Sequence, residues 1–278
     1  MANSQKLVVI ERIYNQLLKT GGSLKKTITN DDIVAAIDWC NNNKGTTLST
    51  NNPANFIKDI IRGKNASGMW PDSLKVARIG ADQVTGNGRV FEFVPYAAGQ
   101  TLPFPNRFAY HAGAERHRIQ SVSMPLASKA LGRDDETYLI QVLVKLSVVE
   151  THFALFSPIN VIELNHLQIG IKLRLCELDA LFTANYIDKN KEQHSLIITA
   201  EAKRKNQRLL EEQVIRQVHG AFQITNTQLV VPIAMTSIEG GVYLTEFKAV
   251  RRDELASFKE LELEADKVYE LVPMVKGV

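Results

Sequence analysis

Two apolar segments near the middle of the chain end in charged side chains whose types and spacing suit hydrolytic chemistry. Glu201 and Lys203 lie at the end of SLIITAEAK, and Glu177 and Asp179 lie in ELDALF. Residues i and i+2 of a strand share one face, so the two side chains of each pair project to the same side. If the two strands are neighbours, three carboxylates and one ammonium gather at one end of a sheet.

Such a cluster favours binding of a metal ion. Unpaired charges beside apolar strand residues are destabilising unless they compensate one another or bind an ion. Two or three carboxylates suit a hard divalent cation such as Mg²⁺. A cation there polarises a phosphoryl oxygen and lowers the pKa of a bound water, and a lysine beside it positions that water or offsets negative charge. The alternative is a surface salt bridge on an edge strand.

The hydrophobic pattern around these segments predicts a mixed α/β, or α+β, domain. A helix is expected first, then three strands, a second helix and a further strand, followed by additional elements. The expected ranges are a helix over 136–155, two strands over 160–183 with a break near Gln168–Gly170, a strand over 195–204, a helix over 206–223, and strands over 227–236 and 241–250.

The first 110 residues have a different organisation. Helices are expected over 5–19 and 31–42, the second capped by Thr29 or Asn30, and a third helix over 53–63, capped by Asn52. Two short strands within 76–94 surround a turn, and 95–110 is expected to be a linker. Three helices followed by a hairpin are typical of a winged helix-turn-helix module, which binds DNA. The alternative is a small helical subdomain that touches no nucleic acid.

Charge supports the DNA-binding interpretation of this N-terminal part. Residues 1–110 hold 13 Lys/Arg against 8 Asp/Glu, a net charge of +5, whereas the whole chain carries +3. A basic surface attracts a polyanion. The third helix would enter a groove, and the hairpin tip would form the wing. The candidate DNA contacts are Asn55, Lys58, Arg62 and Lys64 on the helix, and Asn87 and Arg89 on the hairpin.

ELDALF followed by LIITAEAK resembles the PD-(D/E)XK nuclease superfamily, especially its type II restriction endonucleases. The core of that superfamily is a helix, three antiparallel strands, a helix and a strand, which matches the order expected over 136–236. The proline of the family name is absent, since Leu178 precedes Asp179. The resemblance implies a restriction-endonuclease-like core within 111–278 that hydrolyses phosphodiester bonds of double-stranded DNA with Mg²⁺.

The resemblance also implies a role for individual residues. Asp179 and Glu201 would bind the metal, together with the backbone carbonyl of Ala202, and Lys203 would lie near the attacking water. Many members carry a glutamate on the first core helix, for which Glu150 is the candidate; Glu163 is a weaker one, and Glu177 is an alternative. The resemblance further implies a homodimer and a companion methyltransferase that is not a stable partner.

The helix after Lys203 adds further candidates. Gln213 and Gln217 lie one turn apart on the same side of it, and some branches of the superfamily place a glutamine here near the metal or the DNA backbone. Arg204, together with Lys205 and Arg208, forms a basic cluster suited to phosphate contacts. Ordinary solvent-exposed helix residues are the alternative interpretation.

The sequence excludes several other classes of protein. Cys40 and Cys176 belong to no Cys-x-x-Cys pair, the six histidines form no zinc-ligand spacing, and His152 is expected in the core or a polar network. No secretory signal is recognisable at the N-terminus, and no apolar run reaches the ~20 residues of a membrane helix, so we expect a cytoplasmic protein without a membrane partner.

Two alternatives to a restriction enzyme remain open: a repair or junction nuclease of the same fold, and a non-catalytic winged-helix regulator.

Overall fold

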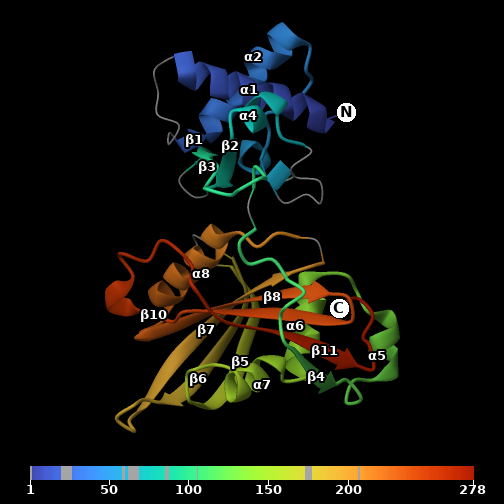
Figure 1. The fold of residues 1–278 in the computed structure, drawn as a ribbon, viewed down its shortest axis with the longest axis vertical. Helices are drawn as coiled ribbons and strands as arrows, with labels where there is room; N and C mark the ends of the chain where they lie inside the picture. The colour runs from blue at the N-terminus through green and yellow to red at the C-terminus, as the bar shows by residue number, and fades with distance from the viewer. Residues whose placement is uncertain are drawn as a thin grey trace. The chain divides into compact units, whose positions relative to one another are not determined.

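The chain divides within the segment that was expected to be a linker. In the computed structural model, one unit spans Met1–Arg107 and the other Phe108–Val278, close to the boundary predicted after residue 110. The two units are drawn in blue to green and in green to red in Figure 1. The structure describes residues 2–19, 27–57, 60–61, 69–84, 88–104, 106–172, 177–205 and 207–278.

The first unit begins with the two helices that periodicity predicts. Helix α1 spans Ala2–Lys19 and α2 spans Asn30–Lys44. Thr29 caps α2 through a capping box: its side chain accepts from the Asp32 backbone N–H, and the Asp32 carboxylate accepts from the Thr29 backbone. Their apolar faces are buried as the spacing requires, at Val9, Ile10, Ile13 and Leu17 of α1 and at Ile33, Ala36, Ile37 and Cys40 of α2.

The rest of this unit contains a small antiparallel sheet with the order β1-β3-β2. Strands β2 (Ile79–Gln83) and β3 (Arg89–Pro95) form the expected hairpin, and its tip at 85–87 lies outside the described residues. Strand β1 (Thr27–Thr29) and helix α4 (Asp72–Val76) were not predicted, because both are too short to show a period.

The expected third helix is described only in part. Its first turn is the 3₁₀ helix η1, Pro53–Asn55, with Pro53 at the predicted first position. Residues 60–61 are helical, while 58–59 and 62–68 lie outside the described residues. Asn52 occupies the N-cap position, as expected, but its side chain makes no capping hydrogen bond.

The second unit is built on one mixed sheet with the strand order β4-β11-β9-β8-β7-β6-β5. Strands β5, β6 and β7 are antiparallel to one another, and β8 runs parallel to β7. The strands are β4 (Arg116–Gln120), β5 (Val161–Lys172), β6 (Glu177–Ile187), β7 (Gln193–Lys203), β8 (Leu229–Ile238), β9 (Gly241–Phe247), β10 (Val250–Arg251, paired with β8) and β11 (Leu263–Val272), and the 3₁₀ helix η3 is Arg252–Glu254.

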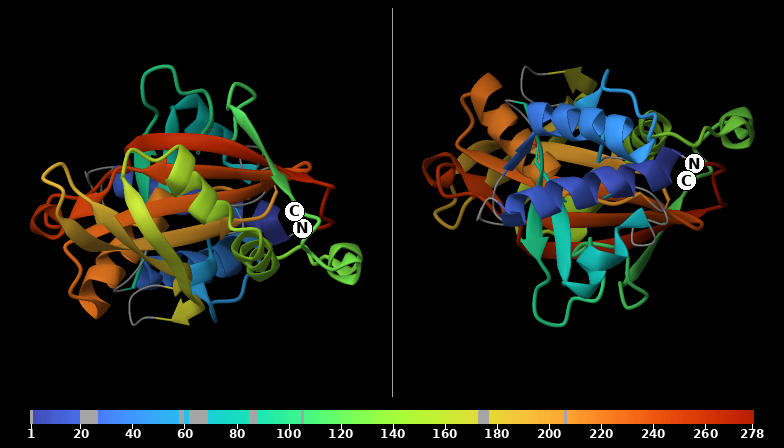
Figure 2. Two further views of the ribbon diagram at one scale, coloured as in Figure 1. Left: turned by 90° about the horizontal axis from the view of Figure 1, so that it is seen from below. Right: turned by 90° about the horizontal axis from the view of Figure 1, so that it is seen from above.

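Helices cover both faces of this sheet (Figures 1 and 2). Helices α6 (Glu136–Lys145) and α7 (Val148–Leu155) pack on one face, against Phe182, Ile198 and Ile233 among others. Helix α8 (Glu211–Ile224) packs on the other face, where Val218 and Phe222 contact Leu181 and Ile197. The short helix α5 (Leu126–Leu131) buries none of its residues. The observed order is therefore helices, three antiparallel strands, a helix and a parallel strand.

The segment 136–155 was expected to be one helix, and this was wrong. The helix breaks between α6 and α7, where Ser147 adopts a left-handed conformation with φ of 51°. The two helices are bent by 59° at this break. Across the described residues, no single helix is long and apolar enough to cross a membrane, and only this bent pair reaches that length and composition together.

The strand break expected near Gln168–Gly170 was also wrong. Strand β5 continues through it, because a bulge between His166 and Gln168 and a left-handed Gly170 (φ 67°) absorb the irregularity. Helix α8 begins at Glu211, later than the predicted position 206. Neither difference moves the acidic residues of β6 and β7 away from each other.

Candidate active site

Asp179 and Glu201 lie side by side on adjacent strands. Strand β6 pairs antiparallel with β7, and Ala180 lies opposite Ala200. Because the strands run in opposite directions, Asp179 before Ala180 and Glu201 after Ala200 come next to each other. Asp179 Oδ2 accepts a hydrogen bond of 2.8 Å from the backbone N–H of Ala202. The two carboxyl groups are close enough to hydrogen-bond to each other.

Glu201 is fully buried and held from both sides. Its Oε1 accepts from the ammonium of Lys203, two residues along the same strand, as their shared face requires. Its Oε2 accepts from Nε2 of Gln217 on α8. Burial raises the pKa of Glu201 to about 7 and the charge of Asp179 adds to this, while the Lys203 ammonium opposes it. A carboxyl group with such a pKa favours a cation as its neighbour.

Asp179 is partly buried, and its pKa is also raised, first by burial. The Ala202 N–H and the Lys203 ammonium lower it again, and the charge of Glu136 raises it. Glu136 is the first residue of α6, and its Oε1 lies 3.9 Å from Nε of Arg204. Of Glu136 and Glu150, only Glu136 has a charge that reaches Asp179, as the smallest of the effects on the pKa of that carboxyl group.

Glu150, the candidate from the sequence, lies elsewhere. It is on α7, beyond the bend, and burial alone raises its pKa while its own backbone lowers it, with no contribution from the acidic pair. Its Oε2 is buried without a hydrogen-bond partner in the described part of the chain. Sequence reasoning missed Glu136 because it treated 136–155 as one continuous helix; the available signal was the acidic first turn after the N-cap Asp135.

The other two acidic candidates also stand apart from the pair. The side chain of Glu177 is exposed. Its backbone carbonyl accepts a hydrogen bond of 3.1 Å from Gln217 Nε2. Glu163 accepts from the amides of Asn165 and Asn185, near the opposite end of β5 and β6. The site therefore contains Asp179, Glu201 and Lys203 of the predicted set, with Glu136 at its edge.

The two glutamines of α8 carry unsatisfied acceptors. Gln217 is fully buried, and its Oε1 has no hydrogen-bond partner among the described residues. The Oε1 of Gln213 is likewise buried and unpartnered in the described chain. Buried amide oxygens normally have partners, so these atoms mark a polar region that accepts a further donor or cation. Because Gln217 is buried, it positions Glu201 and does not face DNA.

The basic candidates beside the pair are exposed. Arg204 donates to the backbone carbonyl of Asp134 at 3.1 Å and leaves 41% of its side chain exposed. Lys205 Nζ lies 3.4 Å from the exposed Glu239. Arg208, near the start of α8, is also in contact with other groups. These cations form a positive border at the end of β7, next to the buried acids.

The DNA-binding candidates of the first unit are described less completely. Lys58, Arg62, Lys64 and Asn87 lie outside the described residues. Arg89 is exposed at the first position of β3, and Asn55 is exposed at the end of η1. Both described candidates are therefore accessible to a partner.

His152 occupies a separate polar network, as the sequence predicted. Its Nδ1 lies 2.8 Å from the Tyr269 hydroxyl and its Nε2 lies 2.9 Å from Glu246 Oε2. The hydroxyl of Ser157 donates to Glu246 Oε1 at 2.8 Å. All the polar groups of this buried network are paired within it, so it offers no site to a ligand.

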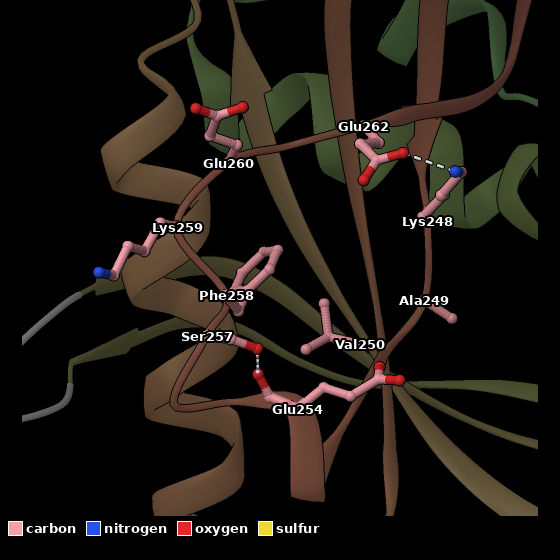
Figure 3. A pocket seen from close by; sticks show the side chains of 9 residues that line it. All are labelled: Lys248, Ala249, Val250, Glu254, Ser257, Phe258, Lys259, Glu260 and Glu262. Atoms are coloured by element: carbon pink, nitrogen blue, oxygen red, sulfur yellow. Dashed lines mark hydrogen bonds and ion pairs between the residues drawn. The ribbon is translucent and has the colours of Figure 1, made fainter.

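Two other features lie away from the acidic pair. A cavity of about 590 Å³ lies beside β10 (Figure 3), and the Lys248–Glu262 ion pair spans its border. Its lining residues are Lys248, Ala249, Val250, Glu254, Ser257, Phe258, Lys259, Glu260 and Glu262. Asp188, Glu192 and His194 cluster in the turn between β6 and β7, at the end of the hairpin opposite Asp179, where Asp188 accepts from its own turn.

The donor set around Asp179 and Glu201 fits a hard divalent cation. Two adjacent carboxylates with raised pKa values and a buried amide oxygen without a partner supply the oxygen ligands that Mg²⁺ prefers. Searches against protein-family models, curated proteins and solved structures find no match to the chain.

Proposed function

We propose that this protein is a Mg²⁺-dependent endonuclease of the restriction type, which hydrolyses phosphodiester bonds of double-stranded DNA. The observation that carries this proposal is the joining of Asp179 and Glu201 across β6 and β7, with Lys203 donating to Glu201. The pair is framed by three antiparallel strands, a helix and a parallel strand, the core order of the PD-(D/E)XK nucleases that the sequence resembles.

Each residue then has a chemical task. Asp179 and Glu201, with the carbonyl of Ala202, would hold Mg²⁺, and Glu136 would add a further carboxylate at the edge. A bound Mg²⁺ supplies Lewis acidity toward a phosphoryl oxygen and activates a water. Lys203 orients the attacking water and offsets the negative charge that develops on the phosphate. Gln217 keeps Glu201 in place by linking it to the backbone of Glu177.

The first unit supports the choice of DNA as the substrate. Helices α1 and α2, a helical segment that begins at Pro53 and the β2–β3 hairpin follow one another as in a winged helix-turn-helix module. We propose that Lys58, Arg62 and Lys64 of the third helix expected from the sequence, with Arg89 of the hairpin, contact DNA. A homodimer would place two such units on a two-fold symmetric site.

The direct test is a digestion of unmethylated phage DNA by the purified full-length protein. The reactions contain Mg²⁺ or EDTA and compare the wild type with Glu201→Gln. Glu163→Gln is the matched control, since it alters an exposed glutamate of the same sheet that accepts hydrogen bonds from two asparagines. Discrete fragments that require Mg²⁺, persist in Glu163→Gln and vanish in Glu201→Gln support the proposal.

Other outcomes redirect the proposal. Cleavage restricted to branched DNA would replace the restriction enzyme with a structure-specific nuclease. DNA binding without cleavage, equal in the wild type and Glu201→Gln, would refute nuclease activity and favour a regulator. DNA binding itself is tested by replacing Lys58 and Arg62 with alanine: the slope of affinity against salt should fall by about 2. Lys75→Ala is the control, because Lys75 pairs with Asp72 on α4.

A further inference from the structure

Both carboxylate oxygens of Glu201 already accept hydrogen bonds from the protein. Lys203 Nζ occupies Oε1 and Gln217 Nε2 occupies Oε2. Glu201 itself has no exposed surface. A cation that binds Glu201 must therefore compete with these two donors for the lone pairs of the carboxylate.

The two donors differ in how firmly they are held. Gln217 is fully buried on α8 and shares the same Nε2 group with the Glu177 carbonyl, so moving it would break two hydrogen bonds. The Lys203 ammonium has Glu201 as its one hydrogen-bond partner in the described residues, at the end of a flexible four-carbon chain. Its side chain also retains 9% exposure, which leaves it a route outward. Lys203 is thus the donor that can move.

Geometry and charge point to the same position. Asp179 turns Oδ2 to the Ala202 N–H, which leaves Oδ1 for a cation shared with Glu201. The Lys203 ammonium donates to Oε1 of Glu201 and its charge also acts on Asp179, so a cation shared by the two carboxylates lies near this ammonium. An ammonium and a divalent cation repel each other strongly in a site this poorly solvated.

We infer that Lys203 has two positions: one in which its ammonium neutralises Glu201, and one to which it moves when a divalent cation binds the Asp179–Glu201 pair. In the second position Lys203 faces the scissile phosphate. Lys203 is therefore placed for catalysis only after the cation has bound, which orders the assembly of the site. This inference rests on the proposed function and deepens it.

The test measures Mg²⁺ binding to the full-length protein without DNA. Isothermal titration at about pH 8.5, above the Glu201 pKa of about 7, compares the wild type with Lys203→Met. The variant keeps the stem of the side chain and removes the competing charge, so it should bind Mg²⁺ about tenfold more tightly. Lys248→Met is the matched control, because Lys248 pairs with the exposed Glu262 away from the acidic pair and should leave the affinity unchanged.

A second measurement uses the wild type and does not depend on a variant that folds. In protein labelled with ¹⁵N-lysine, the side-chain resonance that is missing from Lys203→Met should change on addition of Mg²⁺, as the ammonium leaves Glu201. If Lys203→Met does not fold, Lys203→Gln serves as the variant from which the Lys203 resonance is missing, so the resonance can still be assigned.

The outcomes separate this inference from the proposed function. Tighter binding by the variant, with a changed Lys203 resonance, supports two positions. Equal or weaker binding by the variant, or a wild-type resonance that Mg²⁺ leaves unchanged while it binds, overturns the inference and leaves the nuclease proposal standing. A wild type that binds no Mg²⁺ refutes the metal-dependent function itself.

Discussion

The second unit contains two buried polar clusters, and they differ in whether all of their polar groups have hydrogen-bond partners. In the network of His152, Glu246, Tyr269 and Ser157, both imidazole nitrogens and both carboxylate oxygens have partners. This holds whether the histidine is neutral or protonated, since the Tyr269 hydroxyl both donates and accepts. The cluster is closed on itself, and it fixes α7 to β9 and β11.

The cluster of Asp179, Glu201, Lys203 and Gln217 is not closed. Two adjacent carboxylates share one ammonium, burial raises the pKa of both acids, and the Oε1 of Gln217 has no partner in the described chain. A closed polar network stabilises a fold, whereas an open one with excess negative charge is stable only with a cation or a proton. The comparison therefore makes the open cluster, and not the closed one, the candidate for function.

The largest expected effect is on cleavage, and it should differ between the two clusters. Glu201→Gln removes a proposed ligand of Mg²⁺ and should lower the rate of cleavage by about 10³-fold or more, equivalent to roughly 4 kcal/mol of transition-state stabilisation. Glu246→Gln should leave the rate within about threefold. Single-turnover cleavage of one mapped site measures both rates. Equal losses in the two variants would mean that the two clusters do not differ in function.

The free energy of unfolding should show the reverse order, with a larger loss for a Glu246 variant than for a Glu201 variant. Glu246→Leu leaves His152 Nε2 without a partner and the Ser157 hydroxyl without an acceptor, so it should lower the free energy of unfolding by about 3 kcal/mol. Glu201→Leu removes a carboxylate that is already unfavourably buried, and Lys203 can turn outward, so the expected loss is about 1 kcal/mol or less. Urea unfolding followed by circular dichroism measures both values. A larger loss for Glu201→Leu would contradict the contrast.

The third effect is the dependence of stability on pH. The pKa of Glu201 is raised in the folded state from 4.5 to about 7, so the folded protein binds this proton more tightly than the unfolded chain does. The stabilisation, on the order of 3 kcal/mol, is fully present below pH 4.5 and is lost as pH rises through 7. Glu201→Gln should remove this loss between pH 4.5 and 7, and Glu246→Gln should retain it. A wild type whose stability rises over this window would contradict the raised pKa.

Local pattern predicted much of the fold and most of the candidate site. The period-2 spacing placed Glu201 and Lys203 on one face, and the order of the strands brought Asp179 beside them. The periodic helices α1, α2 and α8 were predicted for the same reason, since their apolar faces repeat over several turns. Short elements such as β1 and α4 have no such repeat.

Contacts between distant residues could not be predicted. His152 is separated from Glu246 by 94 residues and from Tyr269 by 117, and β4 pairs in parallel with β11 from near the two ends of the unit. Glu136 was missed for a different reason: the bend at Ser147 sets the direction of each helix, and an apolar run with several valines does not reveal a left-handed serine. Glu136 and Glu150 consequently lie on two separate helices, α6 and α7.

The smallest expected effect concerns the positive border of the open cluster. Arg204→Ala removes an exposed cation next to Lys203, so DNA affinity should fall by less than about tenfold and the slope of affinity against salt by about 1. The matched control is Arg118→Ala on β4, beside the strand that carries Tyr269; Arg118 pairs with Glu270 and is 81% exposed. Fluorescence anisotropy at several salt concentrations, without Mg²⁺, measures both slopes.

If the open cluster is where the DNA backbone lies, only the arginine at its border changes the slope, because counterions are released only where a cation neutralises a phosphate. An equal change for Arg118→Ala would mean that DNA is attracted by the general charge of the unit and is not aligned with the acidic pair. That result would separate binding from the chemistry that Asp179, Glu201 and Lys203 are arranged to perform, because a phosphate that does not lie beside Lys203 cannot be attacked there.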